Sequence, residues 1–66
     1  MADDLRVVRG WIIVHATRGD DGRLVRGAGE ELRLSPFDAV RERRDAQIPW
    51  SAILEASVQR LAFWRR

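Results

Sequence analysis

The sequence predicts one small α+β domain, in which an N-terminal antiparallel β-hairpin or three-stranded meander (residues 5–34) packs against two C-terminal helices (residues 35–66). Three patterns indicate this arrangement. The run LRVVRGWIIVHAT, residues 5–17, is rich in β-branched and aromatic side chains and has no helical period. The RGDDGR that follows it is typical of a turn. The segment 48–66 carries bulky apolar side chains three and four positions apart, the period of an amphipathic helix.

The first strand is expected over residues 5–17, with a hairpin turn near Asp20 to Gly22. Neighbouring residues of a strand point to opposite faces, so the run WIIV places apolar side chains on both faces. We therefore expect the middle of this strand to be covered on both sides.

The returning segment, RLVRGAGEELRLS, is a weaker strand because Gly27 and Gly29 interrupt it. Two arrangements fit the pattern. The hairpin is long and bends sharply through a bulge at these glycines, or Ala28-Gly29 is a second turn that makes the three-stranded meander.

A first helix is predicted from Pro36 to about Ala46, with Ser35 as its N-cap and Asp38 in a position like that of a capping box. Its acidic and basic residues balance, and Arg41 is at pairing distance from both Asp38 and Asp45, which predicts a solvent-exposed face with ion pairs between neighbouring turns. Phe37 and Val40 are expected to form a narrow buried stripe.

Pro49 disfavours helix at the residue before it, so a second helix is predicted to begin at Pro49 or Trp50 and to run to the end of the chain. Its apolar stripe is long and unbroken, and we expect it to pack in the core with Trp50 among the core residues. The stripe consists of Trp50, Ile53, Leu54, Ser57, Val58, Leu61 and Ala62.

At 66 residues the chain is near the size at which one hydrophobic core is marginal, so good packing or association must supply stability. No cysteine is present, which excludes disulfides and thiolate metal sites and favours a cytoplasmic location. Residues 1–4 are expected to be a flexible N-terminus, and the segment does not resemble a secretory signal. No apolar run approaches the roughly 20 residues of a transmembrane helix. All basic residues are arginine, but the formal net charge is only +2.

The inventory for catalysis is thin, so the sequence predicts a protein that is not an enzyme. His15 is the only histidine, and no second histidine, cysteine or carboxylate cluster gives it a catalytic or metal-binding companion. The acidic doublets are expected to be solvated surface and turn residues. We therefore assign no catalytic residue, no metal site, no cofactor and no small-molecule substrate.

The favoured function is a small protein-protein interaction module, expected to be a homodimer through the sheet or the last helix, of an accessory or phage type. Aromatic and arginine side chains are those enriched at interface hot spots, and a chain this short has limited room to bury three tryptophans. The expected partner-binding residues are Trp11, Phe63, Trp64, Arg65 and Arg66.

The alternative is a nucleic-acid-binding regulator that contacts phosphates with arginines of the sheet and of the first helix. Its expected contact residues are Arg9, Arg23, Arg26, Arg41, Arg43 and Arg44. Acidic residues are interleaved with these arginines, and none of the familiar nucleic-acid-binding motifs is visible.

Overall fold

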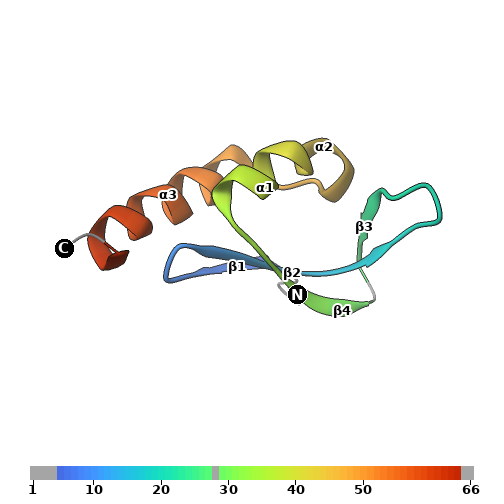
Figure 1. Ribbon diagram of the computed structural model, residues 1–66, viewed down its shortest axis with the longest axis horizontal. Helices are drawn as coiled ribbons and strands as arrows, with labels where there is room; N and C mark the ends of the chain where they lie inside the picture. The colour runs from blue at the N-terminus through green and yellow to red at the C-terminus, as the bar shows by residue number, and fades with distance from the viewer. Residues whose placement is uncertain (1–4, 28, 65–66) are drawn as a thin grey trace.

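The computed structural model of the chain describes residues 5–27 and 29–64. Over these residues, an antiparallel sheet is followed by helices that lie on one side of it (Figure 1). The predicted fold class is thus confirmed, although the sheet has four strands rather than two or three. The elements are β1 (Leu5–Val8), β2 (Trp11–Arg18), β3 (Leu24–Arg26), β4 (Glu30–Leu34), α1 (Pro36–Arg41), α2 (Arg43–Ala46) and α3 (Trp50–Trp64).

The single strand predicted over residues 5–17 is two strands, β1 and β2, joined by a tight turn at Arg9 and Gly10. Both turn residues have positive φ angles, 50° and 84°, as a two-residue hairpin loop of type I′ requires. Val8 pairs with Trp11 directly across the turn. The prediction was wrong because apolar residues continue on both sides of the turn, and Arg-Gly is not one of the dipeptides that normally signal such a loop.

Strand β2 is the centre of the sheet and pairs with all three other strands. Residues 12–14 pair with β1 and β4 at once, so these two strands lie on opposite edges of β2. Ala16 likewise pairs with Arg26 of β3 and with Glu30 of β4. Strands β3 and β4 therefore lie on opposite edges of β2 and do not pair with each other, so the chain crosses β2 between Arg26 and Glu30. Ala28 of the expected second turn lies outside the described residues. A Cβ at Gly29 would lie 2.5 Å from the carbonyl oxygen of Ala16, so this crossing requires glycine.

The first predicted helix is interrupted at Glu42, which divides it into α1 and α2. Ser35 caps α1 as predicted, because its hydroxyl accepts a hydrogen bond of 3.1 Å from the backbone N–H of Asp38. Gln47 ends α2 in the left-handed region, and α3 begins directly after Pro49. The predicted ion pair between Arg41 and Asp38 is present at 3.2 Å.

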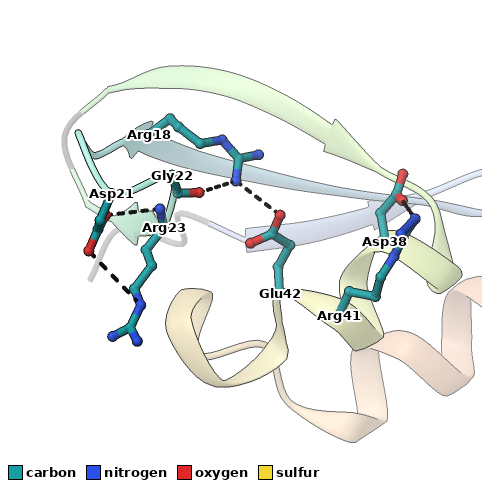
Figure 2. A network of polar contacts seen from close by, with 7 residues as sticks. All are labelled: Arg18, Asp21, Gly22, Arg23, Asp38, Arg41 and Glu42. Carbon is teal, nitrogen blue, oxygen red and sulfur yellow. Dashed lines mark hydrogen bonds and ion pairs between the residues drawn. The ribbon is translucent and has the colours of Figure 1, made fainter.

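A polar network ties the turn between β2 and β3 to the junction of α1 and α2 (Figure 2). The guanidinium of Arg18 donates hydrogen bonds to the carbonyl oxygen of Gly22, at 2.7 Å, and to the carboxylate of Glu42, at 3.0 Å. Asp21 stabilises the same turn, because its carboxylate accepts from the backbone N–H of Arg23 at 3.0 Å. The helices are thereby fixed to the sheet at this end of the molecule.

The core lies between the sheet and the helices, and small side chains supply much of it. Five of its eleven buried apolar residues are alanines, four of which come from the helical half of the chain. The core consists of Ile12, Val14, Ala16, Leu24, Leu34, Ala39, Ala46, Ile48, Ala52, Ile53 and Ala56. No aromatic residue of the described chain belongs to it. The predictions that Phe37, Val40 and Trp50 are buried were therefore wrong.

Candidate protein-interaction surface

The bulkiest apolar side chains of α1 and α3 are exposed to solvent. Phe37 is 79% exposed, Leu61 67% and Leu54 66%, values unusual for residues that follow an amphipathic period. We call this surface the α1–α3 face and define it as Phe37, Val40, Trp50, Leu54, Val58 and Leu61.

The alanines of the helices explain why these side chains point outward. Ala52 and Ala56 lie one turn apart on α3 and are both buried, which turns the opposite side of the helix, with Leu54 and Leu61, away from the sheet. Ala39 does the same for α1, where Phe37 and Val40 are exposed. Small side chains let a helix approach the sheet closely, and that close approach leaves no room for larger ones.

Two shallow hollows open on the α1–α3 face, and both are lined by Ile53 and Ser57. The first, about 300 Å³, lies between the two helices and is also lined by Pro36, Phe37, Val40 and Arg60. The second, about 410 Å³, lies along α3 and is also lined by Trp50, Ser51 and Leu54. The small side chain of Ser57 does not project between the two hollows, because its hydroxyl donates a hydrogen bond to the carbonyl oxygen of Ile53 on its own helix at 2.9 Å.

An arginine-rich hollow of about 470 Å³ adjoins the face where α2 meets the start of α3. The guanidinium of Arg43 stacks over the ring of Trp50 at 4.4 Å from its centroid, a cation–π contact. The full lining is Val40, Arg41, Arg43, Arg44, Asp45 and Trp50. The apolar face therefore has a positively charged border at this end.

Trp11 and Trp64, which are expected to bind a partner, meet each other around Arg60, and Trp64 is 49% exposed. Their ring centroids are 5.8 Å apart, and the Arg60 guanidinium lies 4.6 Å from the centroid of Trp11 and 4.0 Å from that of Trp64. The Nη2 atom of Arg60 is buried without a hydrogen-bond partner among the described residues, and the guanidinium stacks against the two indoles.

The same cluster holds the turn between β1 and β2 against α3. The side-chain oxygen of Gln59 accepts from the backbone N–H of Gly10 at 2.8 Å, and Nε of Arg60 donates to the Gly10 carbonyl at 2.7 Å. The indole N–H of Trp64 donates to the carbonyl oxygen of Arg9 at 3.2 Å. Trp11 and Trp64 thus have a structural role within the chain.

Of the remaining predicted partner-binding residues, Phe63 is 62% exposed on the last turn of α3. Arg65 and Arg66 lie outside the described residues. Of the predicted partner-binding residues that the structure describes, Trp11 and Trp64 are therefore in contact with each other.

The arginines predicted for nucleic-acid binding are spread over the molecule. Arg9 lies in the β1–β2 turn and Arg23 beside the β2–β3 turn, and these turns are at opposite ends of the sheet (Figure 1). Arg23 is 3.9 Å from the carboxylate of Asp21, and Arg26 donates to the carbonyl oxygen of Gln47 at 2.7 Å. Only Arg41, Arg43 and Arg44 come together, in the hollow beside Trp50.

The sheet face that points away from the helices carries a separate ion-pair group. Arg6 contacts the carboxylate of Glu31 at 2.9 Å, and Nε2 of His15 lies 3.5 Å from the same carboxylate. The hydrogen bond and positive charge of Arg6 lower the pKa of Glu31, with a smaller contribution from His15. All three side chains are about half exposed, which is typical of a solvated surface group.

The sequence prediction assigned the residues of the α1–α3 face to the core, although it also expected a homodimer through the sheet or the last helix. One signal was present, since Ala52 and Ala56 form a second apolar stripe on the other side of the last helix. When a helix is apolar on two sides and packs on one sheet, only one of those sides is buried and the other remains exposed.

Comparisons with protein families, with curated proteins and with solved structures give no match for this chain. Within the described residues, no helix is both long and apolar enough to cross a membrane. The part of the chain that the structure describes also brings together no group of histidine and carboxylate side chains suited to a metal ion.

Proposed function

We propose that this chain is a small non-enzymatic protein-interaction module that binds its partner through the α1–α3 face. The exposure of this face carries the proposal. Its six residues are 47% to 79% exposed, on the order of 700 Å² of accessible surface in total, which is at the upper end of the apolar patches found on soluble monomers. Exposing such a surface permanently to water is unfavourable, so a protein partner that covers it is the simplest explanation.

The proposal moves the contact surface away from the end of α3. Trp11 and Trp64 serve the fold by enclosing Arg60 and holding the β1–β2 turn, which favours the α1–α3 face over them as the principal contact. Trp50 becomes the aromatic anchor, with Arg43 stacked on it, and aromatic and arginine side chains are the common hot spots of protein interfaces. The absence of cysteine supports a cytoplasmic site of action.

Affinity purification from the source cells tests the proposal, with two differently tagged copies of the chain expressed together. Leu54→Glu places a charge in the middle of the face at a position 66% exposed, so the fold is expected to survive. Val25→Glu is the matched control, because Val25 is 59% exposed but lies on β3 and not on the α1–α3 face.

We expect a protein, either a different chain or the second tagged copy, to co-purify with the wild type and with Val25→Glu. The co-purifying protein should be absent when Leu54→Glu is used. Its binding to the wild type should persist at high salt, because salt screens contacts between charges and not apolar contacts. Partners that bind all three forms equally, or no partner at all, would contradict the proposal.

A further inference from the structure

We infer that the occupant of the α1–α3 face is a second copy of this chain, with the two α3 helices packed antiparallel about a two-fold axis. This inference rests on the proposed function, since it names the partner of the same surface. Its support comes from the area of the face, the composition of the core, the shape of the face and the placement of charge.

The area of the face matches what a stable dimer requires. A standard protein interface buries about 800 Å² on each partner, and the face offers on the order of 700 Å² of mainly apolar surface before its rim is counted. The described chain exposes 5030 Å² in all, so this single face is a large share of the surface of a small molecule. Phe37 and Trp50, with Arg43 stacked on Trp50, are also of the residue types enriched at interfaces.

The core explains why a second copy is needed. Five of its eleven buried apolar residues are alanine, and every described aromatic residue lies outside it. A chain of 66 residues with no disulfide has few other sources of stability. Pairing two copies through the face would bury Phe37, Trp50 and the leucines of α3, which the monomer leaves in water.

The face carries both hollows and exposed leucines, the combination that a two-fold contact between identical surfaces can use. Leu54 and Leu61 project on either side of Ser57, where the two hollows of about 300 and 410 Å³ meet. A two-fold axis near Ser57 brings the projecting leucines of one copy opposite the low surface of the other. Knobs and hollows on the same patch are what an isologous interface needs.

Charge selects the antiparallel orientation. In a parallel pair, the hollow lined by Arg41, Arg43 and Arg44 in one chain would lie beside the same hollow of the other chain, so like charges would repel each other. In the antiparallel pair, the two hollows lie toward opposite ends of the paired helices. A helix of 15 residues is about 22 Å long, so that separation exceeds the Debye length at physiological salt.

Solution mass from analytical ultracentrifugation, over a range of protein concentrations and at low and high salt, tests the pairing. We expect the wild type and Val25→Glu to form a dimer that persists at high salt, and Leu61→Glu to be monomeric at least tenfold above the wild-type dissociation constant. Circular dichroism of the Leu61→Glu monomer should show a folded chain, because Leu61 is 67% exposed.

Single cysteines test the orientation, since the chain has none of its own. Ser57→Cys near the axis should form a disulfide-linked dimer under mild oxidation. Ser51→Cys should not, because six residues of helix on each side of the axis separate the two thiols by roughly 18 Å, far beyond the 4.4–6.8 Å between Cα atoms of a disulfide. Efficient crosslinking of Ser51→Cys alone would indicate a parallel pair and overturn the antiparallel arrangement.

The outcomes separate this inference from the proposed function. A wild type that is monomeric at all concentrations, or a dimer unaffected by Leu61→Glu, overturns the second copy as the occupant. If a different protein then co-purifies through Leu54, the proposed interaction module stands and only its partner changes. If neither the chain itself nor another protein binds through the face, both fail.

Discussion

At the scale of single residues, Gly10 occupies a position that only glycine can fill without strain. It sits in the β1–β2 turn with φ at 84°, and its backbone N–H and C=O are bonded by Gln59 and Arg60 of α3. A Cβ added to it would lie 2.5 Å from Cγ of Arg60. The position therefore needs glycine for two reasons, the left-handed backbone and the close approach of α3.

Gly22 separates these two reasons, because it has the same φ of 84° and nothing within 4 Å of an added Cβ. We expect Gly22→Ala to lower the free energy of unfolding by about 1 kcal/mol, the cost of the left-handed conformation alone. Gly10→Ala should cost about 3 kcal/mol, because displacement of Arg60 adds to it. Urea denaturation of both variants measures the difference, and equal losses would show that α3 does not constrain the turn.

Glu31 gives a pH-dependent prediction at the same scale. Arg6 lowers the pKa of Glu31 in the folded chain. Its contribution to stability is therefore complete above the ordinary pKa of 4.5 and is lost as the pH falls through the lowered value. In Arg6→Gln, the Glu31 pKa measured by NMR titration should rise toward 4.5, with His15→Gln producing a smaller rise. A pKa that does not move in Arg6→Gln would rule out the ion pair in solution.

Local residue chemistry predicts the structure at some positions of this fold but not at others. Ser35 as a helix cap, the pairing of Asp38 with Arg41 and the turn at Asp20 to Gly22 follow from local rules, and all three are present. The β1–β2 turn escaped prediction because Arg9 adopts a positive φ that its side chain does not favour. The turn is held by Trp64, which bonds Arg9, and by Gln59 and Arg60, which bond Gly10. Contacts between residues about 50 positions apart leave no local signal.

At the scale of elements, the alanines of α1, α2 and α3 set how the helices lie on the sheet. Ala39, Ala46 and Ala56 are fully buried. They bring the helices close to the sheet, with α2 lying against β3, and orient the larger side chains outward. The helix–sheet packing and the exposed face are thus two results of the same sequence pattern.

Ala56→Leu tests this role of the alanines. With Ala56 fully buried, three added carbons must displace the sheet or the helix, and we expect a loss of about 1 to 3 kcal/mol in the free energy of unfolding. Ala62→Leu makes the same chemical change at an exposed position of the same helix and should change stability by no more than about 0.5 kcal/mol. Guanidinium denaturation of both variants is the measurement. A stable Ala56→Leu protein would mean that the alanines leave spare room.

The period of α3 predicted a helix correctly but not the side on which it packs. Both the stripe with Trp50 and Leu54 and the stripe with Ala52 and Ala56 are apolar, and hydrophobicity alone favours burial of the larger residues. The structure buries the smaller stripe, whose alanines let α3 pack closely on the sheet. Sequence reasoning therefore found the residues of the candidate surface while assigning them to the wrong environment.

At the scale of the whole molecule, the domain is thin, with extents of 40 × 26 × 18 Å over the described residues. One layer of helix covers one face of the sheet, and nothing in the described chain covers the outer side of the helices. Its stability should consequently depend on association.

We expect the thermal unfolding midpoint of the wild type to rise with protein concentration, because a dimer gains stability by mass action. Leu61→Glu should have a lower midpoint that is independent of concentration, and Val25→Glu should behave as the wild type. Differential scanning calorimetry over a hundredfold range of concentration measures this. Identical midpoints at all concentrations for the wild type would show that the domain is stable alone.

The separation of the tryptophans has a spectroscopic consequence. Trp11 and Trp64 enclose Arg60 and depend on the docking of α3, whereas Trp50 lies on the α1–α3 face with 57% of its surface in water. A Trp50→Phe variant would emit only from the pair and report the integrity of the fold. The difference between its fluorescence and that of the wild type would report the environment of the face, so two optical signals from one unlabelled chain can follow folding and assembly separately.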